Sequence, residues 1–580
     1  MPVPTHGPTL MISRSLLFVV LAALLVVPLS AHAQEADTTQ LPEIAPREIE
    51  IRGERQIALP SLERQPLTGF ASPPSLPSVP ADHRPYVGAY TYPLDELPES
   101  LPVPETVSDA MQPTAEPAKG FIEGGTGRYF SRFFEGRVGI PLSPEERVSV
   151  HGTYTGTEAD PDDDVLEARV RLESDQEVLR LNAEVFGAVQ RYALFGATPL
   201  GPSATPRREG FSGGGAFRLE STGAVAASAG LRYEGAEYTS DFGTSGGSPN
   251  ELAFSQQQVT LQGAASAPLP YPPRLEVTYR RSWLGGDPAD DTAFDLGATG
   301  TITFYPTPST TVDVGATLLA YNTPAVPTNP VLGDADATFV APAVRAEWRF
   351  ADDARLFLRN QPRLGDTSLN SLYATNPYAQ HAPSLRPTLE TTNAEAGFTL
   401  SRGVVRVVAA AGYRYAPTYR FYALSSQALN GTDNLYRVGY ESARVLEGRG
   451  QLALQGVDGV QASLGLSVRD GTLTSIDSLD SDIPNFAPVA ADAMVAVSFL
   501  DGDGFVEAHG RFESPRDAGL LPQSPRVGSY FSVDLEGSYS LGANTEIVAR
   551  AENLSVEAPT EWEQYPRPPA QISVGLRLKW

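Results

Sequence analysis

The chain contains no cysteine among its 580 residues, so it can form neither disulfides nor thiolate metal sites. Charged residues are also scarce, at 19% of the chain against a usual share of about 25%. Beyond one N-terminal stretch there is no run of about 18 apolar residues, so the sequence predicts no spanning helix. Acidic residues outnumber basic ones, and the net charge of -26 argues against nucleic acid as a partner.

The N-terminus has the organisation of a signal peptide. Arg14 precedes an almost entirely apolar run at 16–29, and Ala31 and Ala33 form an A-x-A cleavage site. The alternative, a membrane anchor, is disfavoured because the run is short and lacks a basic flank after it. The sequence therefore predicts a signal peptide over residues 1–33, cleaved after Ala33.

Residues 34–118 differ from the rest of the chain because proline recurs throughout them. Proline lacks the amide donor that helices and strand ladders need, which favours an extended linker. The segment is predicted either to lie in the periplasm as a tether or to enter the barrel mouth as a partial plug. Both alternatives stay open at this point, and a periplasmic tether could also dock partner proteins.

The last ten residues, 571–580, alternate strictly between apolar and polar or small side chains. This period of two places every apolar side chain on one face of a β-strand. In an outer-membrane barrel that face meets lipid and a terminal aromatic residue lies at the interface, whereas the alternative is a strand of a soluble sandwich. The predicted membrane-closing residues are Ile572, Val574, Leu576, Leu578 and Trp580.

From Lys119 onward the chain consists of about 22 such segments, joined by links that alternate between short and long. Short links include 221–223 and 401–403, and long ones include 239–251, 361–388 and 416–434. Outer-membrane barrels have short periplasmic turns and long extracellular loops. The sequence therefore predicts an all-β fold, a transmembrane antiparallel up-and-down β-barrel over residues 119–580. Tyrosines near strand ends are expected in an interfacial girdle: Tyr413, Tyr415, Tyr419 and Tyr422.

Residues that carry chemistry are few and isolated. An acidic loop offers weak calcium ligands, for which solvated loop side chains are the commoner explanation: Asp160, Asp162, Asp163 and Asp164. A G-x-S-x-G match at 210–214 lies in a continuing strand pattern, not in the strand–turn–helix that a nucleophile elbow requires. The histidines have no partner at zinc-ligand spacing. The sequence thus predicts no catalytic residue and no cofactor.

Three short motifs resemble TonB-dependent receptors. Asn553-Leu554 and Tyr565-Pro566-Arg567 before the terminal strand resemble the closing hairpin of that family, although the loop glycine is missing. The opening hairpin, with residues 119–125 and 127–129, and Asn376-Pro377-Tyr378 resemble a plug-less group of receptor-like barrels, typical of Bacteroidetes and related lineages.

This resemblance implies an outer-membrane barrel that binds or passes a solute, with outer-membrane lipid and the barrel-assembly machinery as partners. The alternative is a structural or assembly barrel whose periplasmic tail, 34–118, docks other proteins. An outer-membrane hydrolase is a third, weaker possibility.

Overall fold

The computed structural model describes residues 119–580, apart from gaps at 159–162, 195, 200–204, 222, 224, 246–247, 287–290, 324–334, 382–384, 426–428, 430–431, 475–479, 522, 555–559 and 568. The predicted signal peptide with Ala31 and Ala33, the linker 34–118, and the loop residues Asp160 and Asp162 lie outside the described residues.

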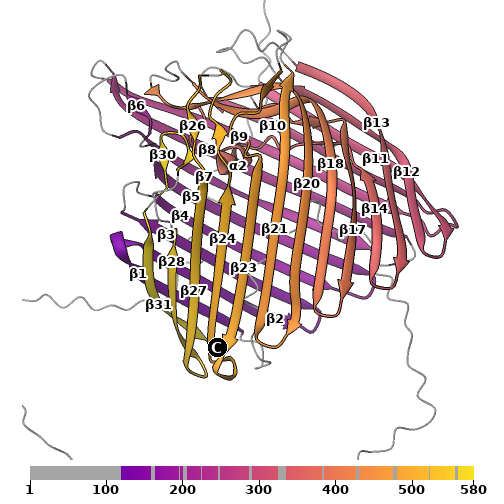
Figure 1. Cartoon of the computed structure of the whole chain (residues 1–580), viewed down its shortest axis with the longest axis horizontal. Helices are drawn as coiled ribbons and strands as arrows, with labels where there is room; N and C mark the ends of the chain where they lie inside the picture. The colour runs from indigo at the N-terminus through magenta and orange to yellow at the C-terminus, as the bar shows by residue number, and fades with distance from the viewer. Residues whose placement is uncertain are drawn as a thin grey trace, which may run out of the picture. The chain divides into compact units, whose positions relative to one another are not determined.

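The described chain forms a closed antiparallel barrel of 22 strands, which confirms the predicted fold class (Figure 1). Each strand pairs with the next along the chain, and β1 pairs with β31 to close the ring. The barrel strands are β1 (Gly120–Gly127), β2 (Arg132–Ser143), β3 (Glu146–Thr157), β4 (Asp163–Asp175), β5 (Leu179–Ala193), β7 (Arg207–Ser221), β8 (Ala226–Ser245), β9 (Ser248–Ser266), β10 (Pro273–Gly286), β11 (Asp291–Thr307), β12 (Thr310–Thr323), β13 (Ala335–Ala351), β14 (Ala354–Asn360), β17 (Thr392–Arg402), β18 (Val405–Leu424), β20 (Tyr436–Val457), β21 (Val460–Thr474), β23 (Val489–Phe499), β24 (Gly504–Glu513), β27 (Tyr530–Gly542), β28 (Thr545–Glu552) and β31 (Gln571–Lys579).

The links of the two barrel ends differ in content. One end carries tight turns, whereas the other carries the longer links, which contain nearly all of the remaining short elements (Figure 1). These elements are η3 (Arg128–Phe130), β6 (Thr198–Pro199), β15 (Arg363–Leu364), α2 (Leu369–Thr375), β16 (Leu389–Glu390), β19 (Thr432–Asp433), β22 (Asp480–Asp482), β25 (Arg516–Asp517), β26 (Arg526–Val527), β29 (Thr560–Trp562) and β30 (Tyr565–Pro566), while η4 (Leu500–Gly502) lies at the tight-turn end. Within the described ranges, no helix is long and apolar enough to cross a membrane.

Two of the predicted long links are wrong in extent. Strands β8 and β9 remain paired far beyond the expected turn, so most of 239–251 is strand. Strand β18 likewise continues to Leu424, past the expected end at Tyr415. Backbone pairing continues here because each strand finds a partner of equal length, a condition that local alternation does not reveal.

The outer face of the barrel is apolar. On β31 the side chains of Ile572, Val574, Leu576 and Leu578 are each more than half exposed and share one face. Leu464, Leu466 and Val468 of β21 repeat this arrangement. A continuous band of exposed aliphatic side chains is stable against lipid and costly in water, so the barrel lies in the outer membrane.

The predicted tyrosine girdle is only partly right. Tyr413 is exposed on the outer face, but Tyr422 is buried inside the barrel and Tyr419 packs against a second interior cluster. The register shift between Ala416 and Tyr419 of β18 reverses the alternation of faces, which places Tyr419 on the face opposite to Tyr413.

Buried ion pairs inside the barrel connect the strands at the seam where the ring closes. Glu123 of β1 is fully buried and accepts hydrogen bonds from Arg550 of β28 at 2.7 Å and from Nε of Arg577 of β31 at 2.6 Å. Arg577 also lies 3.4 Å from Glu546, which pairs with Lys579. These charge-assisted contacts join the first strand of the barrel to the last two.

Candidate functional site

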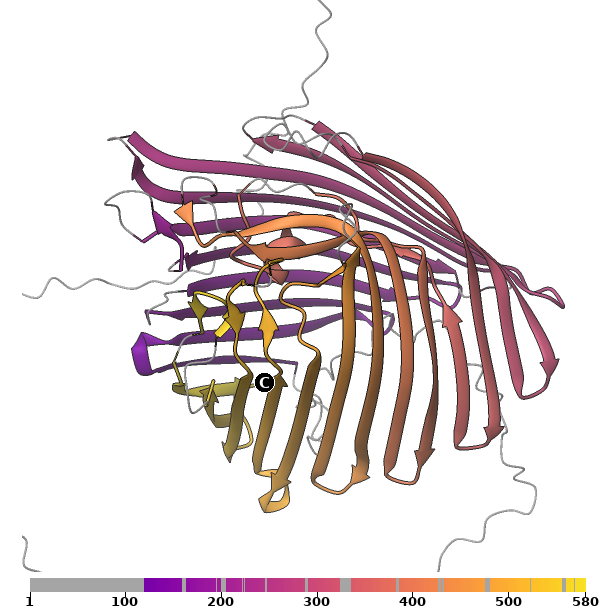
Figure 2. The same cartoon turned by 45° about the horizontal axis from the view of Figure 1, so that its top comes forward.

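The link between β14 and β17 folds into the barrel instead of extending outward. It carries α2, which lies within the ring of strands (Figures 1 and 2). Ser368 caps this helix by accepting a hydrogen bond from the amide of Ser371 at 3.1 Å. The helix ends at Thr375 because Asn376 precedes a proline, which disfavours helical backbone at that position. We call residues 361–381 and 385–388 the infolded loop.

Apolar side chains of the infolded loop pack against both sides of the barrel. Leu369, Leu372 and Tyr373 are almost completely buried in one cluster with wall residues from β8, β9, β18 and β20. Strands β8–β9 and β18–β20 are separated by several strands in either direction around the ring. The cluster therefore spans the lumen. Its wall members are Ala236, Tyr238, Phe254, Tyr422, Tyr436 and Val438.

Arg208 of β7 fastens one side of the infolded loop. Its fully buried guanidinium donates to the carbonyl of Pro377 at 2.7 Å and to that of Ala379 at 2.9 Å. It also donates to Ser240 Oγ at 2.9 Å and lies 4.4 Å from the centroid of the Tyr373 ring. A single side chain thus satisfies two buried carbonyls of the loop.

The opposite wall fastens the same segment through the backbone. The amide of Tyr436 donates to the carbonyl of Tyr378 at 3.0 Å, and the amide of Gln380 donates to that of Tyr436 at 2.8 Å. The Tyr378 ring stacks on Tyr565 with centroids 3.6 Å apart. The motifs 376–378 and 565–567, which the sequence suggested separately, therefore meet in space. Burial raises the pKa of both stacked tyrosines, so their hydroxyls stay protonated.

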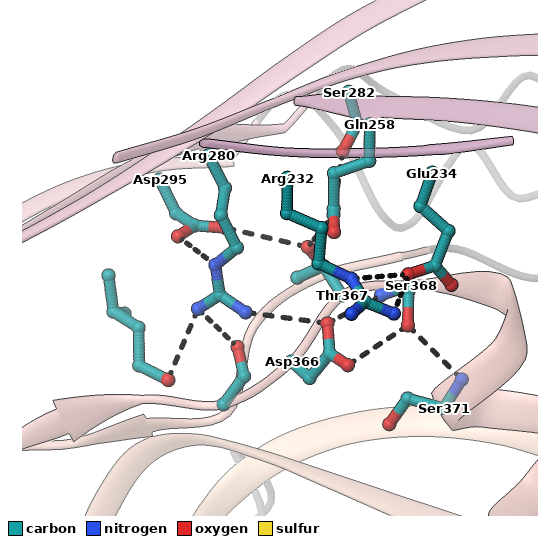
Figure 3. Close-up of polar contacts among 12 residues, drawn as sticks. Arg232, Glu234, Gln258, Arg280, Ser282, Asp295, Asp366, Thr367, Ser368 and Ser371 are labelled. Atoms are coloured by element: carbon teal, nitrogen blue, oxygen red, sulfur yellow. Dashed lines mark hydrogen bonds and ion pairs between the residues drawn. The ribbon is translucent and has the colours of Figure 1, made fainter. Parts of the chain in front are cut away.

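The first part of the infolded loop is held by Arg280 of β10 (Figure 3). Arg280 donates from Nε to Asp295 at 2.7 Å and from Nη2 to the carbonyl of Gly365 at 3.0 Å, and its Nη1 lies 3.4 Å from Asp366. The Oγ of Ser368 donates to the same Asp366 at 2.9 Å. Ion pairing thus connects the wall, the loop and the helix cap.

Glutamines of β9 hold the start of α2. Gln256 accepts from the amide of Leu369 at 2.7 Å and donates to the carbonyl of Thr367 at 3.1 Å, while Gln258 donates to Ser282 at 3.1 Å. These amide and hydroxyl groups satisfy backbone atoms that the lumen would otherwise leave buried without partners.

Two cavities lie beside α2. The larger has a volume of about 1180 Å³ and is bounded by β8–β12, the infolded loop, and the opposite links that carry Asn485 and Trp562. The smaller, of about 380 Å³, lies along β3–β8, where glycine and small residues such as Gly187, Gly210 and Ser212 leave space. Both are lined by charged pairs and hydroxyl or amide side chains. Such linings suit a polar solute in water.

His381 of the infolded loop is buried against Phe254 and lies 3.3 Å from Ser240 Oγ. Burial, together with the nearby positive charge of Arg208, lowers the pKa of His381 to about 4. At neutral pH the imidazole is therefore uncharged and acts as packing for the loop.

Two other groups of residues that the sequence singled out lie on barrel strands and not in the infolded loop. Asp164 accepts a hydrogen bond from Tyr154 at 2.9 Å and lies 3.9 Å from Arg132, and Asp163 stands beside it at the start of β4. Across the described ranges no group of three or more acidic or histidine side chains is placed to hold a metal ion. Calcium binding by the 160–164 loop stays a prediction. The G-x-S-x-G match lies inside β7.

Sequence reasoning missed the residues that hold the infolded loop in place, chiefly Arg208, Glu234 and Arg280 of the wall and Asn370 of α2. The length of the 361–388 link was the available signal, because long links in compact proteins usually have a function or structure of their own. The serine cap ahead of Asn376-Pro377 was a second signal. Nothing local marks the wall residues that face them.

A closed ring of 22 antiparallel strands with an apolar exterior and a polar lumen defines the protein as an outer-membrane β-barrel. No known protein-family profile matches the chain, and no curated protein matches it.

Solved structures do match, at low sequence identity. The FrpB iron transporter from Neisseria meningitidis is 11% identical with a TM-score of 0.62, over 80% of this chain and 82% of its own. The copper transporter OprC is 14% identical with a TM-score of 0.58, over 80% and 82%. The pyoverdine outer membrane receptor FpvA from Pseudomonas aeruginosa is 13% identical with a TM-score of 0.59, over 80% and 78%. The barrel is therefore TonB-dependent-receptor-like in fold.

Proposed function

We propose that this protein binds or passes a polar solute across the outer membrane and has no enzymatic role. The observation that carries the proposal is the cavity of about 1180 Å³ beside α2, lined by ion pairs, amides and hydroxyls. A barrel with only a structural role has no need for a polar internal cavity beside an infolded loop. The solved structures of similar fold, which are named as transporters and receptors, also support the binding or passage of a solute.

The infolded loop takes part in this function as the obstruction of the lumen. It spans the barrel between β8–β9 and β18–β20, where it narrows the path from outside. A lumen of this width needs an obstruction to remain selective. We therefore propose that the protein belongs with plug-less receptor-like barrels. In this proposal residues 1–33 are a signal peptide, 34–118 a periplasmic tether or partial plug, and 119–580 the membrane barrel.

Conductance of the purified protein in planar bilayers tests this function. We expect discrete openings from the full-length protein, because cavities lined by charged side chains flank α2. Deleting 34–118 separates the two alternatives for that segment. A sharp rise in conductance with an intact barrel means that the segment enters the lumen, and no change means that it is a tether.

A folded barrel that shows neither conductance nor binding of any polar solute would contradict the proposal. The remaining function would then be a scaffold whose segment 34–118 docks periplasmic proteins. Capture of periplasmic proteins by a peptide spanning 34–118, but not by a scrambled peptide of equal composition, would support that alternative.

A further inference from the structure

The two cavities beside α2 share four lining residues, Arg232, Glu234, Asn370 and Ala374. Arg232 and Glu234 project from β8, and Asn370 and Ala374 belong to α2. A solute that moves between the cavities passes these side chains. The wall and the helix thus form a narrow junction inside the lumen.

Glu234 is the central group of this junction. Its Oε2 accepts two hydrogen bonds from Arg232, from Nε at 3.0 Å and from Nη2 at 2.8 Å. Its Oε1 accepts from Nδ2 of Asn370, whose Oδ1 in turn accepts from the Tyr238 hydroxyl at 2.9 Å. Only 13% of the Glu234 side chain is exposed, so its position is well defined by these partners.

Arg232 is also held from its other face. Its guanidinium carbon lies 4.2 Å from the centroid of the Phe186 ring, which fixes the group over β5. Gly214 of β7 lies opposite Glu234, and a Cβ there would come within 2.0 Å of the Tyr233 carbonyl oxygen. Glycine at this position therefore allows β7 and β8 to approach closely beside the charged pair.

Acidic groups outnumber basic ones on this side of the lumen. Besides Glu234, the lining from β4 to β11 and the adjacent start of the infolded loop contributes Glu167, Glu276, Asp295 and Asp366, against Arg169, Arg232, Arg280 and Arg363. The opposite lining is balanced, with three arginines and three glutamates: Arg420, Arg511, Arg516, Glu390, Glu513 and Glu561. Solutes close to α2 on its β8 side therefore experience a negative potential.

We propose that Glu234, held by Arg232 and Asn370, sets the charge preference of the junction and favours cations over anions. This inference deepens the proposed function, on which it rests, by naming the residue that discriminates between solutes. Asn370 acts as a positioning residue, because it keeps one carboxylate oxygen facing the passage beside α2.

The absence of native cysteine allows a test that does not depend on conductance. Ala374 is exposed on α2, lines both cavities, and has no side-chain hydrogen bond to lose. In the full-length Ala374→Cys protein, the rates of modification by a cationic and an anionic methanethiosulfonate of similar size are compared. Each rate is normalised to that of a free thiol. We expect the cationic reagent to react faster.

Adding Glu234→Gln should lower the cation-to-anion rate ratio by about fivefold, since one charge acts over a short, partly screened distance. Adding Arg232→Gln should raise it. The matched control is Glu395→Gln on β17, because Glu395 is also a largely buried lumen carboxylate with two arginine partners but lines neither cavity. The control should leave the ratio unchanged.

The inference is overturned if Ala374→Cys does not react, or if Glu234→Gln and Arg232→Gln shift the ratio in the same direction or not at all. Heat-modifiable migration on gels confirms that each variant is a folded barrel. Reversal potentials in a salt gradient report separately on the proposed function. If the protein conducts but Glu234→Gln leaves the cation-to-anion rate ratio unchanged, this inference is wrong and the proposed function stands. If Glu234→Gln shifts the rate ratio as expected but the protein does not conduct, the passage of ions is contradicted.

Discussion

Arg208 places its guanidinium over the ring of Tyr373 and joins strand β7 to the helix of the infolded loop. The same group donates to the carbonyls of Pro377 and Ala379. Because all three partners lie in the loop, Arg208 acts as a latch between the wall of the barrel and its obstruction. The strength of these Arg208 contacts therefore determines how stably the infolded loop stays in the lumen.

Replacing Arg208 with alanine should release the infolded loop while leaving the barrel closed. The buried carbonyl of Ala379 would lose the Arg208 donor, at about 1–3 kcal/mol, and the carbonyl of Pro377 would keep only its bond from the Tyr192 hydroxyl, whereas the strand pairing of β7 is unaffected. We expect higher conductance and faster cleavage by chymotrypsin at Tyr373, which is buried while the loop is held. Arg171→Ala is the control, because Arg171 of β4 pairs with Glu184 of β5 within the barrel wall. Equal conductance of the wild type and Arg208→Ala would show that the loop does not limit passage.

Acid should loosen the infolded loop through His381. The pKa of His381 is about 4 in the closed loop and 6.5 when the side chain is free, so the closed form holds the neutral imidazole. The stabilisation is complete above pH 6.5 and is lost as the pH falls from 6.5 to 4, by up to about 3 kcal/mol. Protease sensitivity of the loop should rise over that window.

His381→Gln provides the control for the acid response, since glutamine keeps a polar side chain but does not titrate. The variant should show protease sensitivity that no longer changes between pH 6.5 and 4. A pH response of the same size in the variant would assign the effect to other groups, such as the carboxylates around Arg280.

Substitution of Glu123 should weaken the closing seam of the barrel. Glu123→Ala leaves Arg550 and Arg577 without their shared, fully buried partner, and breaking such a pair costs about 3–5 kcal/mol. The midpoint of urea unfolding in detergent micelles should fall clearly. Glu220→Ala, which removes an exposed pair with Arg218, should change the free energy of unfolding by less than about 1 kcal/mol. Similar effects of both variants would argue against a special role for the seam.

Removing residues 576–580 should prevent membrane assembly. The truncation deletes the pairing of β31 with the start of β1, including the backbone bonds between Gly120 and Trp580. An open strand edge leaves backbone groups without partners in the membrane. We expect degradation in the periplasm and no heat-modifiable band on gels. A normal level of folded barrel after this truncation would refute the role of the last strand, and a milder effect is expected from Trp580→Phe.

The sequence by itself determined the barrel class, the number of strands and the position of most turns. Alternation along 571–580 is a local property with a period of two, and it survives in the structure as an apolar outer face. The alternation of short and long links could also be predicted from the sequence, because turn residues determine the backbone conformation of their immediate neighbours. The end of strand β8 could not be predicted from the sequence, because the extension of β8 depends on its pairing with β9.

The candidate site was decided only by the tertiary structure. Asn370 meets Glu234, and Arg208 meets Pro377, across more than a hundred residues of chain. Such contacts have no period and no local signature, because they form only when the curvature of the closed ring brings the walls around the infolded loop. Polar residues along a strand predict a lumen, but which of them face one another depends on the register and closure of the whole barrel.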